Sequence, residues 1–180
     1  MKKESTIAYV LRLTVTLLLI TACVAAALAG VNMITKDRIA EAKQQKTLNA
    51  MAAVLPGVDG LEPMELTGET GIVSSVYASG DSYAVQVEPA GFNGKVTMMV
   101  GVSGGKVTGV SVISHTETPG LGAVAAARNA KGEAFRAQFA GQSGTLAVGS
   151  QIDAMSGATI TSNAVVAGVN AALQYVANMG

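Results

Sequence analysis

The sequence predicts an α+β protein, in which an N-terminal transmembrane helix precedes a single domain with a largely antiparallel sheet and flanking helices. Three observations support this fold class: a long uncharged segment near the N-terminus, a series of short Val-rich segments separated by Gly turns, and helical periodicity confined to the last part of the chain. Strands that precede helices, rather than alternating with them, are typical of α+β domains. A mean hydropathy of +0.41 with 13% charged residues also indicates that apolar residues are concentrated in one segment.

Residues 13–34, LTVTLLLITACVAAALAGVNMI, carry no charge over 22 positions. As a helix this segment reaches about 33 Å, enough for a hydrocarbon core of about 30 Å. A cleaved signal peptide has a shorter apolar region of roughly 7–15 residues. The run Ile20–Cys23 resembles a bacterial lipobox, but lipoproteins usually continue with polar residues, whereas this chain stays apolar. We therefore expect an uncleaved span after an N-terminal tail at 1–12, with Cys23 as a small buried filler.

The charges on either side of this span do not determine its orientation. The positive-inside rule compares Lys and Arg near the two ends of a span. Here the two groups nearly cancel, with Lys2, Lys3 and Arg12 on one side and Lys36, Arg38, Lys43 and Lys46 on the other.

Residues 35–57 are expected to form a juxtamembrane helix and linker, with the helix at 37–55 ending before Pro56 and Gly57. The domain then covers 58–180. Runs rich in Val and Tyr, bounded by Gly-Asp and Gly-Gly turns, predict strands at 72–78, 82–88, 95–102 and 106–114.

Two helical regions follow the strands. Residues 123–140 are Ala-rich and predict a pair of short helices broken near Gly132. From Ser162 a last helix is expected, because apolar residues recur at three- and four-residue spacing. Its apolar face consists of Val165, Val166, Val169, Ala172, Leu173 and Val176.

Composition excludes several classes of function. Lys+Arg and Asp+Glu are balanced at 12 each, so no basic surface indicates a nucleic-acid partner. The single Cys23 cannot form an internal disulfide or hold an iron–sulfur cluster. The single His115 excludes a His-rich zinc site. We expect no metal site and no catalytic residue, so that any demanding chemistry belongs to a bound cofactor.

One candidate site is the segment DAMSGATITSN at residues 153–163. A helix that starts at about Ser162 directs unpaired N–H groups and the positive end of its dipole toward Thr159, where an anion such as phosphate is favoured. Gly157 and the residue after it leave room for phosphate oxygens, and Thr161 or Ser162 can serve as N-cap. Two alternatives remain: the segment is an ordinary cap and turn, or Thr159 is a nucleophile, although it lacks an evident base.

A second candidate is SHTETPGLG at residues 114–122, where a strand ends in a turn. Pro119 favours an extended Thr118, while Gly120 and Gly122 allow the backbone to turn tightly. His115 is expected to be a hydrogen-bonding surface histidine.

The two segments together resemble a known family. The pattern Asp153-x-x-Ser156-Gly-Ala-Thr159, downstream of Glu-Thr-Pro-Gly-Leu-Gly at residues 117–122 and a single N-terminal span, is similar to RnfG, the G component of the Rnf electron transport complex. That family is related to the C component of the sodium-pumping NADH:quinone oxidoreductase. The resemblance covers essentially the whole chain, and the chain's length favours the Rnf component over its quinone-reductase relative.

The resemblance implies a cofactor and its site. In this family the last Thr of Ser-Gly-Ala-Thr carries FMN through a phosphoester bond, which a separate flavin transferase installs from FAD with a divalent metal. That position is Thr159. The resemblance also implies a cofactor-binding role for Ser156, Gly157, Ala158, Thr161, Asp153, Thr118, Leu121 and Glu117. Among these, Asp153 belongs to the transferase recognition pattern, while Thr118 and Leu121 line the isoalloxazine ring.

The resemblance further implies an electron-transfer component of an ion-translocating ferredoxin:NAD+ oxidoreductase, not an enzyme by itself. Its partners are the other Rnf subunits, the transferase and the membrane, with the domain on the outer face of the cytoplasmic membrane. Two other classes stay open: a membrane-tethered flavin sensor or reductase outside a pump, and a flavin-free lipoprotein.

Overall fold

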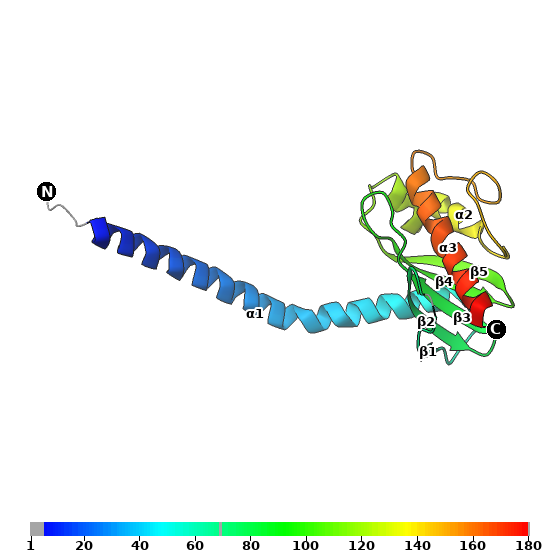
Figure 1. Cartoon of the computed structure of the whole chain (residues 1–180), viewed down its shortest axis with the longest axis horizontal. Helices are drawn as coiled ribbons and strands as arrows, with labels where there is room; N and C mark the ends of the chain where they lie inside the picture. The colour runs from blue at the N-terminus through cyan, green and yellow to red at the C-terminus, as the bar shows by residue number, and fades with distance from the viewer. Residues whose placement is uncertain (1–5, 69, 180) are drawn as a thin grey trace. The chain divides into compact units, whose positions relative to one another are not determined.

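The computed structural model describes residues 6–68 and 70–179 and divides the chain into two compact units, Met1–Gln45 and Lys46–Gly180. Helix α1 (Thr6–Val54) begins in the first unit and ends in the second, so the expected span and juxtamembrane helix are continuous (Figure 1). In the described residues it is the one helix long and apolar enough to cross a membrane. The most apolar stretch of this helix is not buried within the described chain, and Cys23 is exposed. Only surroundings outside this chain could therefore bury the Cys23 side chain.

Within the described residues, the second unit contains a five-stranded antiparallel sheet in sequence order, which confirms the expected antiparallel sheet. Its strands are β1 (Glu62–Met64), β2 (Val73–Ser79), β3 (Ser82–Val87), β4 (Thr97–Ser103) and β5 (Lys106–Ser114). The last four confirm the expected strands to within two residues at each end. Strand β1 was not expected, because it is only three exposed residues long and contains a Pro.

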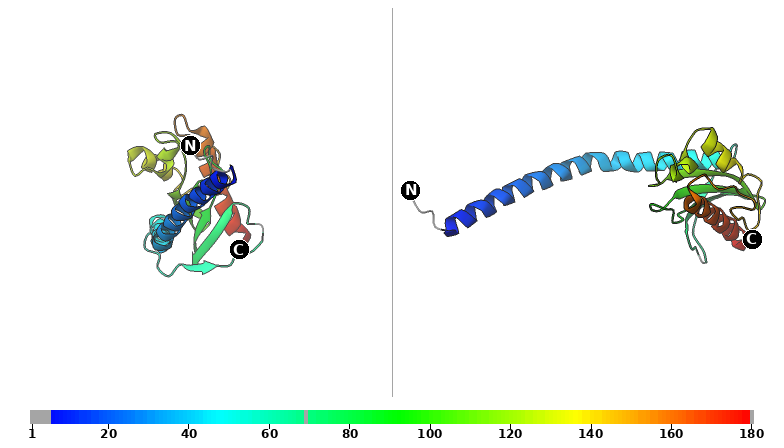
Figure 2. Two further views of the ribbon diagram at one scale, coloured as in Figure 1. Left: turned by 90° about the vertical axis from the view of Figure 1, so that its left-hand side faces the viewer. Right: turned by 90° about the horizontal axis from the view of Figure 1, so that it is seen from above.

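The sheet buries both faces, since successive side chains of a strand point to opposite sides. On one face Ala84 and Met99 pack against the last turns of α1, where Met51 and Val54 are buried. On the other face Val85, Val100 and their neighbours pack against helix α3 (Thr159–Met179). The sheet therefore lies between the end of α1 and α3 (Figure 2). All the residues of the expected apolar face of α3 lie in or against this core.

Helices also cover the region expected at 123–140, but the break lies elsewhere. The 3-10 helix η1 (Gly122–Ala126) and helix α2 (Ala130–Ala137) are separated at 127–129, and Gly132 lies inside α2. Asn129 begins the helix by accepting a hydrogen bond from the Gly132 N–H at 3.0 Å. A Cβ on Gly132 would collide with the carbonyl oxygen of Ala127. Close packing therefore requires glycine at this position, whereas the sequence alone suggested that the glycine breaks the helix.

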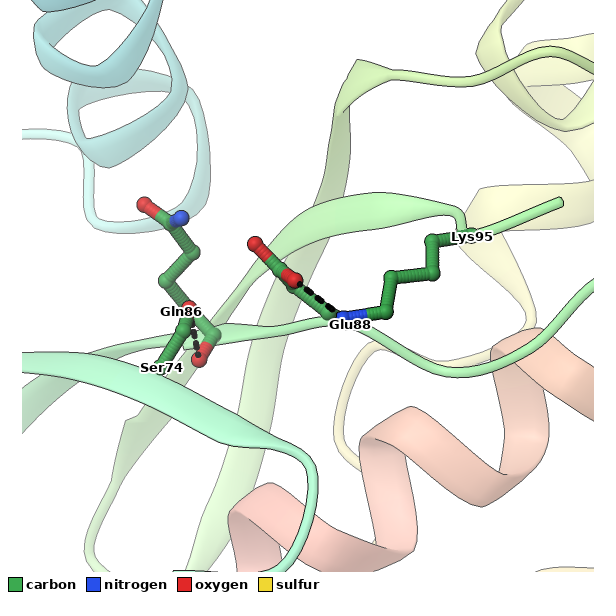
Figure 3. A network of polar contacts seen from close by, with 4 residues as sticks. All are labelled: Ser74, Gln86, Glu88 and Lys95. Carbon is green, nitrogen blue, oxygen red and sulfur yellow. Dashed lines mark hydrogen bonds and ion pairs between the residues drawn. The ribbon is translucent and has the colours of Figure 1, made fainter.

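The loop at 88–96 leads from β3 to β4 and supports the site described below. Glu88 and Lys95 form an ion pair at 3.1 Å across its base, near a hydrogen bond of 3.2 Å from Ser74 to the Gln86 carbonyl (Figure 3). The lysine side chain is 72% exposed, so this ion pair contributes little stability. Backbone hydrogen bonds define the loop more firmly, including Val96 N–H to the Pro89 carbonyl at 2.9 Å.

Candidate functional site

A cavity of about 360 Å³ lies where the loop at 88–96, the turn at 114–122 and the start of α3 meet. Its volume falls at the lower end of the range typical of small-molecule sites, roughly 300–1,000 Å³. The lining residues are Phe92, Glu117, Thr118, Leu121, Gly122, Gly157, Ala158, Thr159, Ile160 and Thr161. The two motifs that the sequence singled out, about 40 residues apart, therefore face one cavity.

Thr159 is exposed and is the first residue of α3. The first helical backbone bond runs from Ser162 N–H to the Ala158 carbonyl at 2.9 Å. The N–H groups of residues 159–161 therefore have no backbone acceptor among the described residues. The first turn of α3 contains no acidic residue, and the positive end of the helix dipole lies beside the Thr159 hydroxyl. A phosphate joined to that hydroxyl would lie where anions are stabilised.

The expected N-cap is wrong. Helix α3 begins three residues before Ser162, so Thr161 and Ser162 lie inside its first turn. Both are buried and make other hydrogen bonds. The Ser162 hydroxyl accepts from Met155 N–H at 2.9 Å and donates to the Ala158 carbonyl at 3.0 Å. It thereby fixes the turn that precedes Thr159, a role the sequence pattern did not reveal.

Glu117 joins the two motifs. The residue is only 5% exposed, and its carboxylate accepts a hydrogen bond from the Thr161 hydroxyl at 2.6 Å. The other carboxylate oxygen accepts from Asn93 N–H at 3.1 Å. A Cβ on Gly91 or Gly122 would collide with this carboxylate, so both glycines are needed for its close packing. A single acid thus connects the loop at 88–96, the turn at 114–122 and α3.

Three further hydrogen bonds organise the turn at 114–122. His115 is half-buried, and its Nδ1 accepts a hydrogen bond from Glu117 N–H at 3.2 Å, as expected for a hydrogen-bonding histidine near the surface. The Thr118 carbonyl accepts from Leu121 N–H and Ala123 N–H, each at 3.2 Å. Gly120 has φ 78°, a backbone conformation that favours glycine.

Leu121 separates the cavity from a neighbouring one of about 680 Å³. A Cβ on Gly157, whose φ is 72°, would lie 3.1 Å from Leu121 Cδ2. Asp153 and Ser156 line the neighbouring cavity and not the one that contains Thr159. The structure therefore brings together seven of the nine expected site residues and places these two beyond Leu121.

Phe92 and Ile160 also line the cavity and were not expected. Phe92 is 67% exposed, Ile160 54% and Leu121 44%, so three large apolar side chains surround the opening. Exposed apolar groups gathered at one cavity indicate a binding surface. An aromatic residue in a Gly-Phe-Asn-Gly loop was the available signal, in a chain with only 4% aromatic residues.

This lining fits a flavin mononucleotide. Apolar side chains at the opening suit a planar ring, and the free N–H groups at the start of α3 suit a phosphate. Thr159 lines the same cavity. Among the described residues no Lys or Arg lines the cavity, so the backbone and the helix dipole are the positive groups available to the phosphate.

Comparison with known proteins supports the same assignment. Residues 91–174 match the family model described as an FMN-binding domain, and residues 1–54 match the RnfG N-terminal region. The G component of the ion-translocating oxidoreductase complex of Methanosarcina acetivorans is 34% identical, over 92% of this chain and 93% of the relative. The G component of the Na+-translocating ferredoxin:NAD+ oxidoreductase complex of Acetobacterium woodii is 33% identical, over 94% and 93%. The chain belongs to the RnfG family, the G components of ion-translocating oxidoreductase complexes.

Proposed function

We propose that this chain is the membrane-anchored electron-transfer component of an ion-translocating ferredoxin:NAD+ oxidoreductase complex, and that it carries FMN covalently on Thr159. The observation that supports this most strongly is the position of Thr159. Its exposed hydroxyl lies at the start of a 21-residue helix and beside an apolar-rimmed cavity, within a matched FMN-binding domain.

The attachment requires a flavin transferase with FAD as donor. In this reaction the Thr159 oxygen forms a bond to the phosphorus next to riboflavin, the pyrophosphate P–O bond breaks, AMP leaves, and the hydroxyl proton is removed. Because Thr159 is exposed and no described residue hydrogen bonds to its hydroxyl, an external enzyme can reach it. Asp153 and Ser156 line the neighbouring cavity on the far side of Leu121, a surface open to the transferase.

The chain's own residues hold and orient the cofactor. Once bound, FMN supplies the one- and two-electron chemistry that protein side chains lack. The N–H groups of residues 159–161 stabilise the single charge that a phosphodiester retains. Thr118, Leu121 and Phe92 would contact the flavin ring, and Glu117 fixes the turn that carries the first two.

The remaining parts of the chain serve membrane attachment. Residues 13–34 form the membrane-spanning segment after a tail at 1–12, residues 35–57 link it to the domain, and residues 58–180 form the flavin domain. The domain lies on the outer face of the cytoplasmic membrane, and the other subunits of the complex supply the ferredoxin and nicotinamide sites.

Coexpression of the full chain with and without the flavin transferase tests the proposal. Denaturing gels of purified complexes should show a fluorescent band at the mass of this chain only with the transferase. The Thr159→Ala variant should lose the band but still copurify with the other subunits, while ferredoxin:NAD+ activity falls. Copurification with no partner subunit would favour a flavin module outside a pump, and absence of the band with the transferase present would contradict covalent attachment.

A further inference from the structure

Strand β5 is an outer strand of the sheet and has no neighbouring strand on one side within the described part of the chain. Its first half is protected, because Val107 exchanges two backbone hydrogen bonds with residues 141 and 142, at 2.7 and 2.8 Å. Beyond Val107, no backbone bond joins this outer side to another described segment. Unpaired N–H and C=O groups on a strand edge are the groups that a further strand pairs with.

A cavity of about 390 Å³ lies along this unpaired part of β5. Four successive residues, 110–113, line it. Because neighbouring side chains of a strand point to opposite faces, four successive lining residues place the cavity at the edge of the strand. The last turns of α1 form one wall, and η1 with α2 forms the other. We call this cavity the β5 slot.

Of the residues that the structure describes, three cations, Lys46, Arg128 and Arg136, and no Asp or Glu line the β5 slot. Burial lowers the pKa of Arg136, Glu133 raises it, and the charge of Arg128 lowers it. Arg136 donates to the carbonyls of residues 125 and 127 at 2.7 and 3.0 Å, which fixes its guanidinium at the wall. The slot thus combines an unpaired strand edge with an excess of positive charge.

We propose that the β5 slot binds an extended acidic segment of another protein of the complex, which adds to the sheet as a sixth strand beside residues 110–113. A phosphate or lipid head group could neutralise the cations, but it has no regular series of N–H and C=O groups to pair with the edge of a strand. An extended peptide supplies both donors and acceptors. Acidic side chains two positions apart would lie on one face of it and reach Arg128 and Arg136. This inference rests on the proposed membership of a complex.

Amide hydrogen exchange of the full chain tests this binding mode. The complex is compared with the free chain in nanodiscs of phosphatidylcholine, with and without phosphatidylglycerol. Exchange of residues 110–113 should slow by about tenfold or more in the complex and should not change with either lipid. Equal exchange in the complex and the free chain would overturn the proposal, as would slowing by phosphatidylglycerol alone. Failure to copurify with partner subunits would overturn the proposed function itself.

Charge-reversed variants complete the test. Arg128→Glu and Lys46→Glu should abolish the slowed exchange at 110–113 and make the chain dissociate from the complex at lower salt, because like charges would face the acidic segment. Lys106→Glu, at the start of the same strand and outside the β5 slot, is the matched control and should leave both unchanged. Covalent flavin should remain in all three variants, which shows that each domain is folded. The proposal is overturned if the control behaves like the slot variants.

Discussion

Two threonines in the first turn of α3 should have opposite roles, although they are two residues apart. Thr161 is 1% exposed and donates a hydrogen bond of 2.6 Å to the buried Glu117 carboxylate. Thr159 is exposed, and no described residue hydrogen bonds to its hydroxyl. We expect Thr161→Val to destabilise the domain while leaving the attachment point present. We expect Thr159→Val to abolish covalent flavin with little loss of stability.

The size of each effect follows from these contacts. Valine has the shape of threonine, so Thr161→Val creates no cavity and removes only the hydrogen bond. A hydrogen bond to a charged group contributes about 1.5–3 kcal/mol, and the carboxylate oxygen that loses this bond stays buried, while the other oxygen keeps its bond to Asn93 N–H. We therefore expect the free energy of unfolding to fall by about 2 kcal/mol for Thr161→Val. For Thr159→Val it should change by less than about 0.5 kcal/mol, as for most surface substitutions.

Chemical unfolding of the flavin-free full chain in detergent measures both values. Tyrosine fluorescence is a suitable signal, because Tyr77, Tyr83 and the buried Tyr175 lie in the domain, whereas only Tyr9 lies in the first unit. Thr161→Ser, which keeps the hydroxyl, should recover most of the stability. The reasoning would be refuted if Thr161→Val were equally destabilising in a Glu117→Gln background, where no carboxylate charge remains to be stabilised.

Two further substitutions test how the turn before α3 presents Thr159. Gly157→Ala should cost about 1–2 kcal/mol of stability, because its φ is 72°, and should reduce flavin attachment because the added Cβ displaces Leu121. Gly144 has the same φ, but a Cβ added there would meet nothing within 4 Å. Gly144→Ala should therefore cost similar stability and leave flavin attachment intact. Equal flavin attachment in the two variants would contradict a role for the Leu121 contact. Ser162→Ala should cost about 1–3 kcal/mol by leaving the Met155 N–H unpaired, and a thermal unfolding curve like that of the unchanged chain would contradict this.

The sheet could be predicted because its strands obey local rules. Val-rich runs between Gly turns predicted β2 to β5, and the spacing of apolar residues predicted the buried face of α3. Features that depend on contacts outside a regular helix or strand were missed or misread. Gly132 suggested a helix break, but glycine is needed there because a Cβ would collide with the carbonyl oxygen of Ala127. Ser162 suggested an N-cap, but it bonds to Met155 in the preceding turn.

The candidate site likewise combines features that short sequence motifs indicate with features that only the folded structure reveals. The sequence motifs singled out Glu117, Leu121 and Thr159, and the structure places these three residues beside one cavity. Phe92 comes from a separate loop without a motif, so only the fold places it there. The separation of Asp153 from the cavity also needs coordinates, since it depends on where the Leu121 side chain lies.

The central claim is most directly tested by peptide mass mapping of the chain purified from its own membrane. Residues 137–180 contain no Lys or Arg, so trypsin leaves them within one peptide, and cleavage after Met155 isolates the start of α3. We predict that this fragment is heavier by one FMN less one water, and that fragmentation places the added mass on Thr159. Quantitative recovery of the fragment without added mass, or with the flavin on another residue, would contradict the account.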